Sequence, residues 1–183
     1  MKFQFQVNVS ENQYIDYNKF WTLKSPYGKK QLITLRGMIL VMVLVFVFLM
    51  LFIQNFQPNA FIACIPFFII LIVCQALLPR FLAFTVESHI KGLRKKGKMA
   101  YSSTSVMEFY DDVFTETTPD NKVEQKYSSI ERISVVDNKV IYIHVNNLMA
   151  YIIPVSVFQS QEQYEEFMQF IKTKCVHADI DIY

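Results

Sequence analysis

The sequence has little glycine and none of the common catalytic motifs. Four glycines in 183 residues leave little room for a phosphate-binding loop, and neither a P-loop, a GxGxxG fingerprint nor a GxSxG elbow occurs. The three histidines, His89, His144 and His177, lack the HxxxH or HExxH spacing of a metal site. We therefore expect no catalysis, no cofactor and no bound metal.

Cysteine is also scarce. The chain has three cysteines, Cys64, Cys74 and Cys175, with no CxxC spacing, so we expect reduced, unpaired thiols.

Residues 1–10 alternate apolar and polar side chains, and the first long apolar run starts too late for a cleavable signal peptide. The net charge of +2 is too small to indicate a nucleic-acid partner, and we expect none.

What the sequence does have is two long apolar runs without a charged residue. Hydrophobic residues make up 52% of the chain and concentrate in residues 38–53 and 60–78. Each run, with its flanks, is long enough to cross a bilayer as a helix, and neither has a polar face. The sequence therefore predicts a transmembrane hairpin over 35–78, with helices at about 35–54 and 60–78. Gln75, a lone polar residue near a helix end, is expected either to bond to a neighbouring helix or to reach the membrane interface.

The placement of basic residues predicts the orientation of this hairpin. The six residues that connect the runs carry no charge, whereas both flanks are basic: Lys24, Lys29, Lys30 and Arg36 come before, and Arg80, Lys91, Arg94, Lys95, Lys96 and Lys98 follow. By the positive-inside rule we expect a multi-pass protein of the plasma membrane with both termini in the cytoplasm.

The second run leads into a basic juxtamembrane segment, residues 79–98, which ends in KGLRKKGK. Two interpretations remain open and are compatible. The segment sets the topology of the hairpin, or it contacts anionic membrane lipids, since each basic residue near such a surface contributes on the order of 1 kcal/mol. The lipid-contact residues would be Lys91, Arg94, Lys95, Lys96 and Lys98.

The N-terminal segment, residues 1–34, predicts a strand and then a helix in the cytoplasm. Residues 3–9 alternate with period two, and Ser10 with Gln13 forms a capping box. Aromatic residues then recur at helical spacing until residues 26–28, Pro-Tyr-Gly, break the helix. This helix either lies in the membrane interface or packs on the cytoplasmic domain.

Residues 99–183 predict a small cytoplasmic domain of short strands closed by one helix. Turn signals separate strands expected at 105–110, 113–117, 123–127, 130–136, 140–145 and 149–153. His144 alternates with apolar neighbours and is expected to face the polar side of its strand. Ser160 and Gln163 cap an amphipathic helix. The fold class is thus membrane α+β, a two-helix hairpin plus a small antiparallel sheet domain capped by a C-terminal helix, as in pleckstrin-homology-like folds.

Several phrases in this order resemble the YcxB-like family of bacterial membrane proteins. They are VSENQYIDYNKFW near the N-terminus, the two apolar runs, the basic segment, and then EFYDDVF, KYSSIERI and IIPVSVFQSQEQYEEFMQFIK. The resemblance implies a membrane protein with a YcxB-like C-terminal domain over 99–183. It implies no catalytic residue.

Three functions from different classes fit these observations. The first is a membrane-tethered interaction or regulatory module that binds a protein or a lipid at the inner leaflet, its protein partner unknown. The second is a subunit of an oligomeric channel or transporter, which makes a homo-oligomer possible but requires polar groups on one face of a span. The third, a membrane-bound hydrolase, has no sequence feature in its favour.

Overall fold

The computed structural model describes residues 1–97, 101–146 and 149–183. The chain divides into two compact units, one of residues 18–96 and one that joins residues 1–17 to residues 97–183. The sequence analysis placed residues 1–34 in a segment of their own. The structure groups the first 17 residues with the C-terminal region instead, because the N-terminal strand completes a sheet there.

Residues 18–96 are helical almost throughout. They comprise the end of α1 (Glu11–Leu23), then α2 (Pro26–Ile53) and α3 (Pro58–Lys95). Pro26 and Pro58 stand in the first turn of their helices, where a missing N–H costs nothing. Ser25 caps α2, since its hydroxyl accepts a hydrogen bond of 2.9 Å from the N–H of Gly28.

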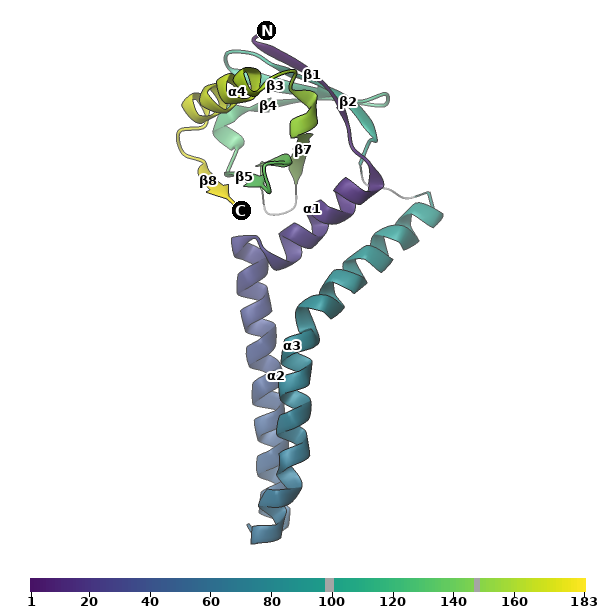
Figure 1. Cartoon of the computed structure of the whole chain (residues 1–183), viewed down its shortest axis with the longest axis vertical. Coiled ribbons are helices and arrows are strands. Elements are labelled where there is room, and N and C mark those ends of the chain that lie inside the picture. Colours follow the sequence, from purple (N-terminus) through teal and green to yellow (C-terminus); the bar gives the residue numbers. More distant parts are fainter. Residues whose placement is uncertain (98–100, 147–148) are drawn as a thin grey trace. The chain divides into compact units, whose positions relative to one another are not determined.

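Both long helices extend beyond the apolar runs. The sequence analysis set residues 79–98 apart from the second span, yet α3 continues through Pro66 and Pro79 and ends only at Lys95. Figure 1 shows α3 bent partway along its length, as prolines inside a helix produce by removing a backbone hydrogen bond. The basic residues before Lys96 therefore belong to the same helix as the second apolar run.

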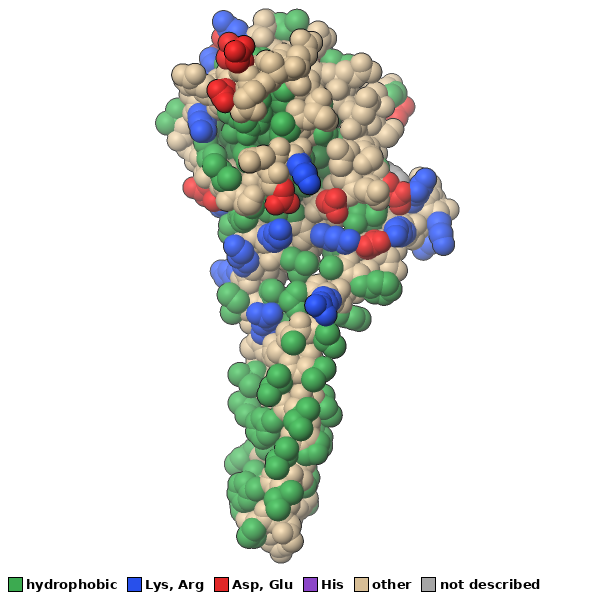
Figure 2. Space-filling view, in the orientation of Figure 1, with side chains coloured by type: hydrophobic (Ala, Val, Ile, Leu, Met, Phe, Trp, Pro, Cys, Tyr) green, Lys and Arg blue, Asp and Glu red, His purple; other side chains and the backbone are tan. Residues whose placement is uncertain are grey.

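The helix pair exposes most of its apolar side chains. Val47, Cys64 and Leu71 are buried. The Gln75 side-chain amide donates a hydrogen bond of 3.0 Å to the carbonyl of Arg36 on α2, which is the first of the two predicted alternatives. In contrast, only 11% of the most apolar 18-residue segment of each helix is buried. In Figure 2 hydrophobic side chains cover these helices, and Lys and Arg gather toward the end where α2 begins. The two helices are long and apolar enough to cross a membrane.

The first sheet is an antiparallel meander. One of its strands precedes the two long helices in the sequence, and the other three follow them. Its order is β1 (Phe3–Asn8), β2 (Thr104–Phe109), β3 (Val113–Thr117) and β4 (Lys122–Lys126). The pairing of β1 with β2 runs from Phe3 opposite Phe109 to Asn8 opposite Thr104. Two strands separated in sequence by both long helices therefore lie side by side (Figure 1).

The second sheet has the order β7 (Ala150–Pro154), β6 (Val140–His144), β5 (Arg132–Val136) and β8 (Asp179–Ile182). A turn was predicted between β5 and β6. Asp137 and Asn138 form it, and both have φ of 51°, in the left-handed region of the backbone. The expected turn at 146–147 falls partly outside the described residues. Strand β8 was not predicted, and it pairs with β5 in parallel.

The core of this unit lies between the two sheets and α4 (Gln161–Lys174). Phe109, Phe114 and Phe167 are fully buried, and the ring of Phe167 packs edge-on against Phe109 at 4.9 Å. Ser160 is the N-cap of α4, and its hydroxyl accepts a hydrogen bond of 3.2 Å from the N–H of Gln163. The predicted capping residues and the predicted apolar face of this helix are thus both present.

His144 corrects one expectation. It was predicted to face the polar side of its strand, but it is 2% exposed. Strand β6 lies inside its sheet, and Tyr17 from α1 covers the outer face, with its ring 5.0 Å from Tyr142 and 6.2 Å from His144. Both faces of β6 are therefore buried. Burial, and secondarily the charge of Arg132, lowers the pKa of His144 to about 4, which keeps the imidazole neutral.

Candidate binding groove

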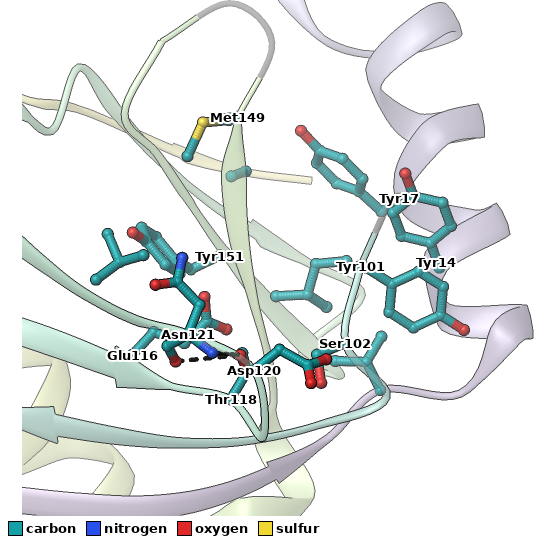
Figure 3. A pocket seen from close by; sticks show the side chains of 14 residues that line it. Tyr14, Tyr17, Tyr101, Ser102, Glu116, Thr118, Asp120, Asn121, Met149 and Tyr151 are labelled. Atoms are coloured by element: carbon teal, nitrogen blue, oxygen red, sulfur yellow. Dashed lines mark hydrogen bonds between the residues drawn. The ribbon is translucent and has the colours of Figure 1, made fainter. Parts of the chain in front are cut away.

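A groove of about 650 Å³ opens in the unit that contains the two sheets. Its walls come from the end of β1, the start of α1, the residues before β2, the turn between β3 and β4, and the start of β7 (Figure 3). The volume is in the range of small-molecule and peptide-anchor sites. The lining residues are Val9, Tyr14, Tyr17, Tyr101, Ser102, Glu116, Thr118, Asp120, Asn121, Val123, Met149, Ala150, Tyr151 and Ile152.

One wall of the groove is aromatic. Tyr14 and Tyr17 are three residues apart on α1 and so project from neighbouring positions of one helix face. The ring of Tyr101 stacks on that of Tyr14, with centroids 4.3 Å apart and planes at 20°. Burial, with a smaller contribution from Tyr14, raises the pKa of Tyr17 to about 12, so this phenol stays neutral. Figure 3 shows the three rings together on one side of the opening.

The other wall combines carboxylates with Tyr151. Glu116 lies on β3 two residues after the buried Phe114, and therefore on the same face of the strand, toward the space between the sheets. Burial raises the pKa of Glu116, while a hydrogen bond with Ser105 acts in the opposite direction. Burial, and secondarily the charge of Glu116, raises the pKa of Tyr151 to about 12. Both side chains line the groove.

The turn between β3 and β4 holds Asp120 at the rim of the groove. The Thr118 hydroxyl donates a hydrogen bond of 3.1 Å to the Asn121 carbonyl and accepts one of 3.0 Å from the Asn121 N–H. These two bonds close the turn and fix Asp120 between them (Figure 3). No lysine or arginine is among the described residues that line the groove, so its charge is negative.

The basic segment predicted from sequence lies elsewhere, at the end of α3. Lys91 forms an ion pair of 2.6 Å with Glu87, which also pairs with Lys19 at 2.6 Å. The side chains of Arg94, Lys95 and Lys96 are exposed at the helix C-terminus, where positive charge is favourable. Lys98 lies outside the described residues. The structure thus places three of the five residues among the exposed side chains of the helix end, and none of the three lines the groove.

No group of three or more His, Cys, Asp and Glu side chains that could hold a metal ion occurs in the part of the chain that the structure describes. Sequence reasoning noted the helical spacing of Tyr14 and Tyr17 but not the groove. The available signal was Glu116, a carboxylate on the apolar face of a predicted strand.

Comparison with protein families identifies the region that carries most of the groove. The sequence model of the family described as YcxB-like protein matches residues 109–171. Residues 109–171 form a YcxB-like domain. No curated protein and no solved structure matches the chain.

The YcxB-like domain runs from the end of β2 to most of α4. It contributes Glu116, Asp120, Met149 and Tyr151 to the groove, whereas the aromatic wall of Tyr14, Tyr17 and Tyr101 lies outside the matched residues. The groove is thus assembled from the family domain and from two further segments, one before and one after the long helices in the sequence.

Proposed function

We propose that this chain is a membrane-tethered interaction or regulatory module. In this proposal α2 and α3 cross the plasma membrane as a hairpin with both flanks in the cytoplasm. The YcxB-like domain, completed by β1, then binds a partner protein or a lipid at the inner leaflet. Tethering would raise the concentration of the domain near any other membrane-bound molecule.

The observation that carries the proposal is the pairing of β1 with β2. These strands precede and follow the helix pair, and they match over six residue pairs in one sheet. If α2 and α3 span a bilayer, their outer flanks must therefore lie on the same side of it. The uncharged turn and the basic flanks support the cytoplasmic side.

The exposed surface of the helix pair supports insertion into lipid. Met38, Phe48 and Ile72 are 63%, 58% and 68% exposed, although each is strongly apolar. Burying one such side chain is worth about 1.5–3 kcal/mol, and the helix pair carries many of them. An apolar environment such as the bilayer core would remove this surface from water.

The sheet unit also supports a pleckstrin-homology-like fold. It has a four-stranded meander, a second meander of three strands, β5 to β7, and then α4. In this view the hairpin is inserted between the first and second strands, and β8 is an addition. The resemblance concerns architecture and assigns no ligand.

The exposed Arg94, Lys95 and Lys96 support a contact with anionic lipid at the inner leaflet. A channel or transporter function has less support, because the amide of Gln75 is used to join α3 to α2.

A labelling experiment tests the topology. In a chain with Cys64, Cys74 and Cys175 replaced by serine, we would introduce either Gln57→Cys in the turn or Lys24→Cys in the flank. A membrane-impermeant maleimide should label the first variant in intact cells and the second only after permeabilisation. Labelling of both in intact cells, or release of the protein by alkaline carbonate, would contradict the proposal.

A further inference from the structure

The groove contains a carboxylate, Glu116, that has no cation beside it in the part of the chain that the structure describes. Glu116 is only partly exposed, and the ion pairs among the described residues involve other side chains. Its polar contact is the hydrogen bond with Ser105. A carboxylate that is partly removed from water and has no opposite charge beside it is unfavourable, and a cationic ligand would relieve that cost.

The surrounding side chains are those that hold a cation on a flexible stem. The stacked rings of Tyr14 and Tyr101 offer aromatic faces, which attract ammonium and guanidinium groups. Met149, Val123 and Ile152 add apolar lining that suits the methylene stem of a lysine or arginine. Asp120 at the rim adds a second negative charge.

The same composition argues against a phosphate ligand. Phosphate sites are built from arginine, lysine or clustered backbone N–H groups, whereas the described lining residues include neither basic type. The basic residues at the end of α3 and the groove thus have opposite charge and would contact different molecules.

The strands beside the groove indicate a polypeptide. Both β4 and β7 are the last strands of their sheets, and both contribute lining residues. The outer edge of such a strand can hydrogen-bond to an extended chain. We propose that the groove binds the guanidinium or ammonium group of an arginine or lysine in an extended segment of a partner protein, between Glu116 and the rings of Tyr14 and Tyr101. This inference rests on the proposed interaction function and names its ligand chemistry.

The test uses the full-length protein in nanodiscs of uncharged phosphatidylcholine, so that lipid charge does not contribute. A displayed library of 12-residue peptides is selected on this protein after depletion on the Glu116→Gln variant. We expect the selected peptides to be enriched in arginine or lysine at one position. Replacing that residue in a synthetic fluorescent peptide by neutral citrulline or glutamine should weaken binding, measured by anisotropy, at least ten-fold.

Matched variants locate the binding. Glu116→Gln should also weaken the peptide at least ten-fold, whereas Glu124→Gln, on the exposed face of β4, should change it less than two-fold. Tyr14→Leu should weaken binding about five-fold and Tyr14→Phe less than two-fold, because phenylalanine keeps the aromatic face. Near-ultraviolet circular dichroism identifies any variant that fails to fold. If a variant at Glu116 fails to fold, the comparison of Tyr14→Leu with Tyr14→Phe tests the site, and if a variant at Tyr14 fails, the comparison of Glu116→Gln with Glu124→Gln does so.

Three outcomes would overturn the inference. They are selected peptides without basic enrichment, equal loss in Glu116→Gln and Glu124→Gln, and binding of amine-headgroup vesicles but of no peptide. None of these affects the cysteine-labelling result, so the tethered topology can hold while the ligand assignment fails. Conversely, a failed topology with Glu116-dependent peptide binding would leave the groove assignment standing.

Discussion

A single buried histidine makes the stability of the sheet unit depend on pH. The folded pKa of His144 is about 4, against an ordinary value of 6.5. Between these values the unfolded chain binds a proton and the folded one does not, so stability decreases as the pH falls through this window. The shift corresponds to about 3 kcal/mol. We expect urea denaturation of the full-length protein in micelles, followed by near-ultraviolet circular dichroism, to show a loss of this size between pH 7 and pH 4.

Other groups also titrate in this range, so the comparison that decides is with His144→Phe. The phenyl ring remains in the aromatic cluster with Tyr17 and Tyr142 but carries no proton. The unfolding free energy of this variant should fall by about 3 kcal/mol less than that of the wild type over the same pH range. Parallel pH profiles would show that His144 is not the group responsible.

At the scale of elements, the junction of α1 and α2 requires a residue without a side chain. A Cβ atom on Gly28 would lie 2.3 Å from the Trp21 carbonyl oxygen and 2.4 Å from that of Thr22, both of which are backbone atoms. We expect Gly28→Ala to destabilise the helical unit by about 1–3 kcal/mol in thermal unfolding of the micellar protein. Gly37→Ala is the control, because nothing lies within 4 Å of its new methyl group. That change should be neutral or should stabilise α2 by up to about 1 kcal/mol.

Strand β8 is held in part by ion pairs to one arginine. The guanidinium of Arg132 on β5 pairs with Asp179 at 2.8 Å and also with Asp181, the two acidic residues of β8. Because these groups are partly exposed, we expect Arg132→Gln to cost only about 1 kcal/mol, seen as roughly five-fold faster hydrogen exchange in β8. Lys174→Gln breaks the 3.7 Å pair with Asp111 and should leave that exchange unchanged. Equal effects of both changes would argue against a specific role for Arg132.

The sequence predicted the helices and strands better than the tertiary contacts of their side chains. The strands β1 to β7 follow from alternation and turn residues, and α1 and α4 from Ser10 and Ser160, because these signals are local. Alternation also shows that Tyr142 and His144 share a face, but it does not show what covers that face. In this protein Tyr17 covers it, from a helix more than a hundred positions earlier. Strand β8 was missed because four residues give a weak pattern and its partner, β5, is distant in sequence.

The groove was unpredictable for the same reason. Tyr14, Tyr101 and Tyr151 come from three distant parts of the chain, and no local pattern connects them. The basic segment, in contrast, was visible as a run of like charges. Its exposure on the helix end agrees with the sequence, while its contact with lipid stays a prediction.

For the whole molecule, the proposed tether makes a prediction about bound lipid. Replacing Arg94, Lys95 and Lys96 by glutamine removes three charges that each contribute about 1 kcal/mol near an anionic surface. The protein purified from membranes should therefore retain several-fold less anionic lipid, measured by native mass spectrometry. The matched control replaces Lys122, Lys126 and Lys139, which are also exposed but lie in the sheet unit. Equal loss in both triple variants would indicate a general charge effect.

The β1–β2 pairing also sets an order of events during biosynthesis. Strand β1 is made first, yet its partner ends only at Phe109, after both long helices have been translated. In the proposed tether, if only one of the two helices crossed the bilayer, the two strands would emerge in different compartments, and Phe5 and Val7 would have no sheet to join. A copy with only one helix inserted would therefore not complete the domain. Such half-inserted copies would expose unfolded chain to proteases, so pairing of the two strands would select against them.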